Sequence, residues 1–204
     1  MADETDLLLA EYQSCAQVAN HIDTVRNVIT SFFLTINGGV LIVLTLVAKG
    51  DVSEDAFGSP QSLLAGVLLG VCTLGTLFTG TVARLRRVQS ERYRIANSIL
   101  DHMLTTDVRS VVALGNRTLA GDAGGRGLDK RITGTYLWSL TIMLPTAALA
   151  GLATYLIAAD IHGLVAGAPA WATGVLTATA ALLAQDRLYF TLSTFHPPAE
   201  GPAA

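Results

Sequence analysis

Four apolar stretches, each long enough to cross a bilayer, constrain this chain more than any other feature. The first two, Val28 to Val47 and Leu63 to Ala83, contain no charged residue. A third runs from Tyr136 to Ala159, and a weaker fourth lies near Ala168 to Leu188. A helix rises about 1.5 Å per residue, so roughly 20 residues cross the ~30 Å hydrocarbon layer. The sequence therefore predicts an all-α, polytopic membrane protein with four transmembrane helices.

Composition and charge distribution agree with this class. The chain is 51% hydrophobic and 14% charged, whereas soluble domains average about 25% charged residues. Ten of the 13 Lys and Arg residues lie between Arg84 and Arg131. A local excess of positive charge beside membrane spans marks the cytoplasmic side. We therefore expect this basic segment and both termini to be cytoplasmic.

The first two spans are expected to continue as cytoplasmic helices. Before the first span, apolar side chains recur every three or four residues from Leu8 to Ile22, which favours one helix from about Asp6 to Lys49. A similar stripe follows the second span, and two spans joined by a short connection must carry their extensions side by side and antiparallel. The expected regions are a cytoplasmic amphipathic helix (1–27), a first transmembrane hairpin (28–83), a basic cytoplasmic helix with a Gly-rich linker (84–134), a second hairpin (135–188) and a cytoplasmic tail (189–204).

Polar residues in the first helix are the candidate pore lining. Arg26, Thr30, Asn37 and Thr45 are spaced by four, seven and eight residues, which we take to place them on one helical face. An unpaired amide in hydrocarbon costs several kcal/mol, so Asn37 must face another helix or water. It either forms an interhelical hydrogen bond or lines an aqueous path whose inner mouth carries Arg26.

Small residues in the second span predict close helix packing. Gly66 and Gly70 form a GxxxG pair, and Cys72, Thr76 and Gly80 continue the small side chains at four-residue spacing. Such spacing lets helix backbones approach closely. The neighbouring helix belongs either to the same chain or to another subunit.

The arginines that follow the second span have three possible roles. Arg84, Arg86 and Arg87 fix topology, bind anionic lipid headgroups or bind nucleic acid. Acidic residues interleave with the arginines, and Tyr93 is the single aromatic residue available for stacking on bases. Topology and lipid contact are therefore favoured, and no nucleic-acid partner is expected. Near the inner end of the fourth stretch, Asp186 and Arg187 can reach water.

No residue pattern points to chemistry. The two cysteines and four histidines have no metal-ligand spacing, and no phosphate-binding or nucleophile motif occurs. Gly124 to Gly127 has the composition of a flexible linker. We therefore expect no catalytic residue, no metal and no cofactor.

Two segments carry a family resemblance. One holds Glu11-Tyr12, Arg26-Asn27 and the run Ser31 to Asn37, and the other is the run Ser90 to Leu100. Over about residues 8–104 the chain resembles the RipA-like octameric bacterial membrane proteins and the SLATT-type two-span effector modules. The resemblance implies a cytoplasmic helix that leads into the first span and another that follows the second span. It also implies homo-oligomeric assembly around an axis, a pore-forming effector role and a bacterial cytoplasmic membrane. The chain differs by adding a third and fourth span.

Three function classes were weighed. A homo-oligomeric pore or ion channel requires a polar stripe, small-residue packing and no chemical site. A membrane enzyme or proton-coupled transporter requires charged residues inside the membrane, which the first two spans do not contain. A non-conducting scaffold that assembles a cytoplasmic protein partner is the alternative. The expected partners are the lipid bilayer and further copies of the chain.

Overall fold

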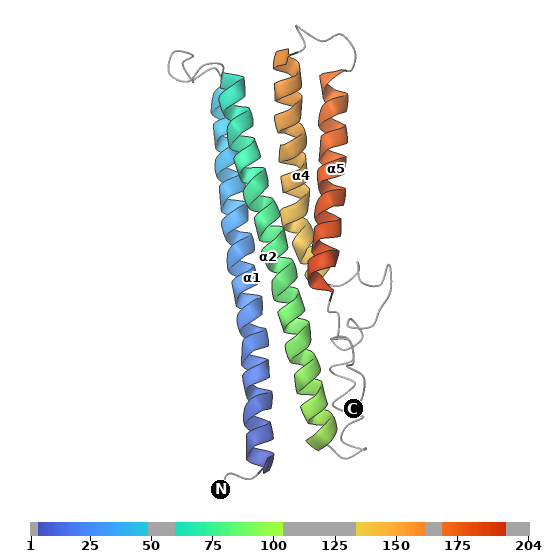
Figure 1. Cartoon of the computed structure of the whole chain (residues 1–204). Coiled ribbons are helices and arrows are strands. Elements are labelled where there is room, and N and C mark those ends of the chain that lie inside the picture. Colours follow the sequence, from blue (N-terminus) through green and yellow to red (C-terminus); the bar gives the residue numbers. More distant parts are fainter. Residues whose placement is uncertain (1–3, 49–59, 104–133, 162–168, 195–204) are drawn as a thin grey trace. The chain divides into compact units, whose positions relative to one another are not determined.

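A computed structural model of the chain describes residues 4–48, 60–103, 134–161 and 169–194, all of whose regular structure is helical (Figure 1). Helix α1 runs over Glu4–Ala48 and α2 over Pro60–Met103, with 45 and 44 residues. The shorter α4 covers Gly134–Ile161 and α5 covers Ala170–Ser193. The all-α expectation is confirmed for the described residues, and α1 matches its predicted bounds within two residues.

Three of these four helices are long and apolar enough to cross a membrane. The qualifying stretches are Asp6–Val47 in α1, Leu63–Ile99 in α2 and Thr135–Ala159 in α4. Helix α5 is not among them, because Gln185, Asp186 and Arg187 interrupt its apolar sequence. Helix α5 also continues to Ser193, past the predicted end of the fourth span at Leu188.

The chain divides into two compact units, to both of which α1 and α2 contribute. Unit 1 contains residues 1–27, 82–137 and 191–204, and unit 2 contains 28–81 and 138–190. The division at 27/28 falls where the first apolar stretch was predicted to begin, and that at 81/82 lies within two residues of the predicted end of the second stretch at Ala83. The hydropathy change along α1 and α2 therefore coincides with a change in their packing.

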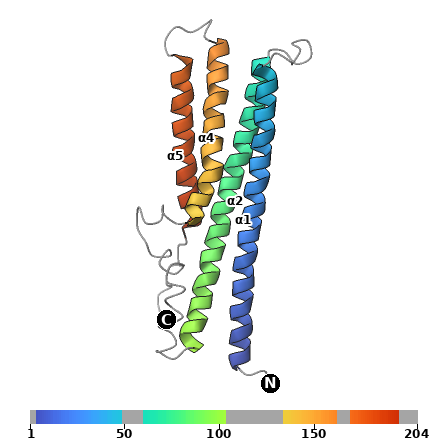
Figure 2. The ribbon, with the colours of Figure 1, turned by 180° about the vertical axis from the view of Figure 1, so that it is seen from behind.

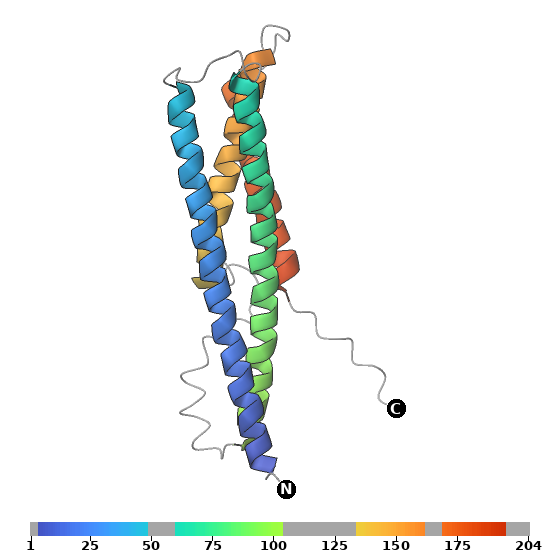
Figure 3. The same ribbon diagram turned by 90° about the vertical axis from the view of Figure 1, so that its left-hand side faces the viewer.

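In unit 1, the first half of α1 lies alongside the second half of α2, running in the opposite direction (Figures 1 and 3). On α1, the predicted apolar stripe is buried at Cys15, Ala19 and Ile22, which are 1%, 1% and 4% exposed. On α2, Ala96 and Ile99 of the predicted stripe are buried, whereas Val88 is exposed. The buried α2 positions Val82, Gln89 and Ala96 follow a seven-residue repeat, which is the spacing of coiled-coil packing.

Unit 2 packs the apolar parts of all four helices. Phe33, Leu68, Ile142 and Met143 are its largest fully buried apolar side chains. Phe78 of α2 contacts Phe33 of α1 edge to face, with ring centroids 6.0 Å apart. Helices α4 and α5 lie side by side (Figures 1 and 2). They approach most closely where Gly151 of α4 faces Gly174 of α5.

Several predictions lie outside the described residues. They concern residues 104–133 of the basic segment, which include the linker Gly124 to Gly127, and the tail after Thr194.

Candidate functional site

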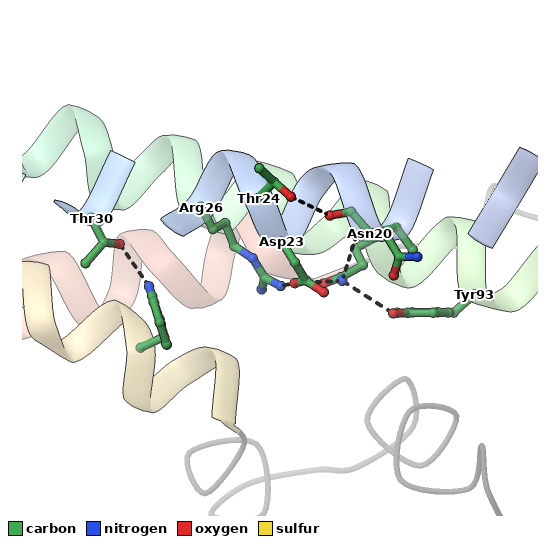
Figure 4. Close-up of polar contacts among 9 residues, drawn as sticks. Asn20, Asp23, Thr24, Arg26, Thr30 and Tyr93 are labelled. Atoms are coloured by element: carbon green, nitrogen blue, oxygen red, sulfur yellow. Dashed lines mark hydrogen bonds and ion pairs between the residues drawn. The ribbon is translucent and has the colours of Figure 1, made fainter. Parts of the chain in front are cut away.

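A buried polar layer crosses the two helices of unit 1. The Arg26 guanidinium forms an ion pair with the Asp23 carboxylate one turn earlier on α1 (Figure 4). Gln89 of α2 donates its side-chain N–H to Asp23 Oδ1 at 3.2 Å, to the Ala19 carbonyl at 3.4 Å and to the Tyr93 hydroxyl at 3.5 Å. Asp23 therefore connects a cation of its own helix to an amide of the opposite helix.

Burial gives the charged and polar groups of this layer a desolvation cost. Arg26 is 8% exposed and Gln89 is 3% exposed. A buried cation is tolerated when a counter-ion and hydrogen bonds replace its water. The Asp23 side chain is about half exposed, so water still reaches the carboxylate that neutralises Arg26. Gln89 has no such balance, because its Oε1 is buried and accepts no hydrogen bond from any residue that the structure describes.

In unit 2, Thr30 of α1 and Trp138 of α4 form a direct interhelical hydrogen bond. The Trp138 indole N–H donates to Thr30 Oγ1 at 2.9 Å. Thr30 is 4% exposed, whereas 44% of Trp138 is exposed. The bond therefore joins a buried hydroxyl to an indole ring that is partly exposed at the protein surface, as tryptophans at membrane interfaces are.

A second polar seam of unit 2 lies between α2, α4 and α5. The Cys72 thiol donates to the Thr146 carbonyl at 3.4 Å, and Gln185 of α5 donates to the Thr76 hydroxyl at 3.4 Å. Gly75 lies directly against the Thr146 side chain, where an added Cβ would overlap it. The Gln185 Oε1 is buried and accepts no hydrogen bond from the described parts of the chain.

The four pore candidates do not share one environment. Arg26 and Thr30 are buried within the chain, Asn37 is half-buried, and Thr45 is exposed. The Asn37 amide N–H donates to the Phe33 carbonyl of its own helix at 2.7 Å. Nineteen residues separate Arg26 from Thr45, and a helix turning about 100° per residue places them roughly 100° apart. The single-face assignment is therefore wrong for Thr45, and whether any of the four lines a pore stays a prediction.

The small residues of α2 fall into two groups. Gly66 and Gly70 are exposed, and no described atom would lie within 4 Å of a Cβ added at either position. Thr76 and Gly80 are half-buried, and Thr76 contacts Gln185. Close approach within the chain instead occurs at Gly75, Gly151 and Gly174, which spacing along one helix could not single out because each contact partner is on another helix.

An exposed face of α1 carries small and hydroxyl residues, of which the sequence analysis singled out Thr45 and missed the other three. Ser31, Thr35, Gly38 and Thr45 are all exposed in unit 2. Ser31, Gly38 and Thr45 are spaced by seven residues. Leucines and isoleucines lie between them, so this spacing is not obvious in the sequence. The hydroxyls of Thr35 and Thr45 donate to the carbonyls of Ser31 and Leu41 on their own helix, at 2.9 and 2.8 Å.

The proposed headgroup arginines lie at the start of the unit 1 part of α2. Arg84 and Arg87 are exposed, and Arg86 is half-buried. Within the described ranges, no group of three or more His, Cys, Asp and Glu residues could hold a metal ion. The layer and the seams contain amides, hydroxyls and one ion pair, which can bind and orient polar groups.

The fold and these contacts define an all-helical protein with three helices suited to a bilayer and buried polar contacts in each unit. No protein-family model, curated protein or solved structure matches the chain. The resemblance to RipA-like and SLATT-type proteins is therefore an expectation that rests on the sequence segments themselves.

Proposed function

We propose that the chain is a polytopic membrane protein that assembles with copies of itself and forms an ion-conducting pore. The observation that carries the proposal is the exposed α1 face in unit 2, with Ser31, Thr35, Gly38 and Thr45. Small residues permit close contact between membrane helices, and threonine hydroxyls provide polarity without a charged group.

The exposed glycines of α2 support self-assembly. Gly66 and Gly70 occupy the GxxxG spacing that brings helices close, yet in the single chain nothing described lies against them. A second subunit is the contact that this spacing favours. If the exposed α1 face points toward the axis of the oligomer and the exposed glycines of α2 contact the neighbouring subunit, the subunits would form a closed ring.

The proposed topology has four spans. Helix α5 has 24 residues and a length of about 36 Å, which suffices for a bilayer although its polar triplet lowers its hydropathy. Its Gly174 packs against Gly151 of α4, and its Gln185 contacts Thr76 of α2. The contact with Thr76 provides a protein acceptor for the Gln185 N–H group, which lipid could not solvate.

The remaining lengths of α1 and α2 support the cytoplasmic extensions. At about 1.5 Å per residue, helices of 45 and 44 residues are more than 60 Å long, about twice the hydrocarbon thickness. The exposed Arg84 and Arg87 follow the apolar part of α2, and the positive-inside rule assigns that end to the cytoplasm. Unit 1 is then the cytoplasmic part, at a bacterial inner membrane.

Ion flux through liposomes tests the pore. Thr35→Val and Thr45→Val remove the hydroxyls with little change in shape, so both should lower the flux if the α1 face lines the conduit. Thr179→Val is the matched control, because Thr179 is an exposed threonine of α5 whose hydroxyl also bonds its own backbone, to Val175. An equal effect of all three variants would contradict the assignment of the face.

The alternative is a non-conducting scaffold. The polar layer and paired helices of unit 1 favour it, because they offer a helical surface to a cytoplasmic protein. Wild-type protein that forms oligomers yet passes no ions in liposomes would replace the pore with this function.

A further inference from the structure

Gln89 interrupts a regular series of small and apolar positions in α2. Leu68, Gly75, Val82, Gln89 and Ala96 are seven residues apart, and all are buried. The two neighbours of Gln89 in unit 1 are the apolar Val82 and Ala96. An apolar residue at position 89 would continue the repeat and bury no amide.

The amide is poorly compensated where it lies. Its N–H group is distributed over three acceptors at 3.2 to 3.5 Å, which are long hydrogen bonds. Its oxygen has no partner in the described chain. A buried acceptor without a donor loses the hydrogen bond that water gave it in the unfolded chain. Stability of the α1–α2 pair therefore does not explain glutamine at this position.

The apolar contacts alone specify the alignment weakly. Cys15, Ala19 and Ile22 are compact side chains that repeat along one face of α1, so a slide of one turn replaces one small apolar contact by another. A slide of one turn moves the helices by about 5.4 Å. That displacement would break the 3.2 Å contact of Gln89 with Asp23 and leave the amide buried without it.

We propose that the layer of Asp23, Arg26, Gln89 and Tyr93 is a register lock for the helix pair of unit 1. Arg26 fixes the Asp23 carboxylate on α1, and Gln89 finds that carboxylate in one alignment of α2 only. The lock lowers the stability of the correct alignment slightly and that of shifted alignments more. This role of a buried polar residue in paired helices does not depend on the pore.

Disulfide trapping in the purified full chain tests the lock, in a Cys72→Ala background that leaves Cys15 as the native thiol. Because Gln89 contacts Ala19 and Asp23 on an antiparallel helix, Ala96 lies level with about residues 12–16 and Ile99 one turn further from Cys15. Ala96→Cys should therefore cross-link to Cys15 in the native register, and Ile99→Cys should do so after a slide. Maleimide labelling after denaturation counts the thiols that are not in the intramolecular disulfide, because Cys15 is buried in the folded chain.

With Gln89 present, the cross-linked fraction should be at least roughly tenfold higher for Ala96→Cys than for Ile99→Cys, since about 1.4 kcal/mol between registers gives that ratio. Adding Gln89→Leu should bring the ratio of these two cross-linked fractions toward one and raise the Tm. Gln89→Met serves as a second apolar variant. Gln13→Leu is the matched control, because it removes an exposed glutamine of α1 in the same unit and should change neither value.

Two results would overturn the lock. The first is an unchanged strong preference for Ala96→Cys in both Gln89 variants, because the apolar contacts would then suffice for the register. The second is loss of the folded protein in both variants, because the amide would then be a stabilising group.

Discussion

The glycine pair that joins α4 and α5 gives the sharpest stability prediction. A Cβ added at Gly151 would lie 2.7 Å from the Gly174 carbonyl oxygen and 2.9 Å from the Ala178 Cβ. A Cβ added at Gly174 would lie 2.9 Å from the Gly151 carbonyl oxygen. Both obstacles include helix backbone, which cannot rotate away as the end of a side chain can. Gly151→Ala and Gly174→Ala should therefore push the two helices apart.

The magnitude follows from the distances. Ordinary van der Waals contact begins at 3.4 Å, so the 2.7 Å contact requires a separation of about 0.7 Å. A gap of that size forfeits a quarter to a half of the dispersion energy of each affected contact. Overpacked sites are destabilised by about 1–3 kcal/mol, which lowers the Tm of a protein of this size by roughly 2–12 °C. The double variant should lose less than the sum, because one separation relieves both overlaps.

Thermal unfolding in detergent, followed by circular dichroism on a single species from size exclusion, measures the effect. Gly66→Ala and Gly70→Ala are matched controls, because an added Cβ meets nothing within 4 Å at either exposed glycine. Alanine favours helix over glycine by about 0.5–1 kcal/mol, so these controls should be neutral or slightly stabilising. An unchanged Tm for both Gly151→Ala and Gly174→Ala would refute the close backbone contact.

Three further predictions concern single contacts. Trp138→Phe removes the donor to Thr30 and should lower stability by about 0.5–1.5 kcal/mol, measured as a Tm shift, whereas an unchanged Tm would show that the bond contributes nothing. Gln185→Leu removes a buried orphan acceptor together with a long hydrogen bond to Thr76, and it should leave the Tm unchanged or higher; a clear decrease would show that the bond to Thr76 outweighs the cost of the unpaired oxygen. Arg84→Gln combined with Arg87→Gln should reduce the anionic lipid that stays bound to the detergent-solubilised protein in native mass spectrometry while leaving zwitterionic lipid unaffected, and equal retention of anionic lipid would exclude the headgroup contact.

The helices and their division were largely predictable from sequence. Uninterrupted periodicity predicted a helix from about Asp6 to Lys49, and the structure has Glu4–Ala48. The boundary between the two units on α1 coincides with the start of the first apolar stretch at Val28, because hydropathy determines whether a helical segment is placed in water or in an apolar environment. Helix α5 was harder to predict as a span, because its length suffices to cross a bilayer whereas its polar triplet lowers its hydropathy.

The contacts of polar residues were not predictable in the same way. Spacing along α1 groups Arg26 with Thr30 and Asn37, but it does not say which neighbour covers that face. The partners Gln89 and Trp138 are more than 60 and 100 residues away from their α1 contacts in sequence. Periodicity reports the surface of one helix, whereas a site depends on the alignment of two.

Helices pack against each other in both units, but through different residue types. The surroundings that we propose for the two units account for this difference. In unit 2, bare glycine backbones meet, as at Gly151 and Gly174, because in lipid the attraction between helices comes from close contact and not from the exclusion of water. In unit 1, water can hydrate the exposed side of Asp23, so a buried Arg26 can be neutralised there without its full desolvation cost. The same ion pair inside unit 2 would have to leave water entirely. The charged layer therefore lies on α1 just before the apolar stretch begins at Val28. The interhelical contacts described beyond that point use glycine backbones and uncharged hydrogen bonds, as at Gly151 and at Thr30.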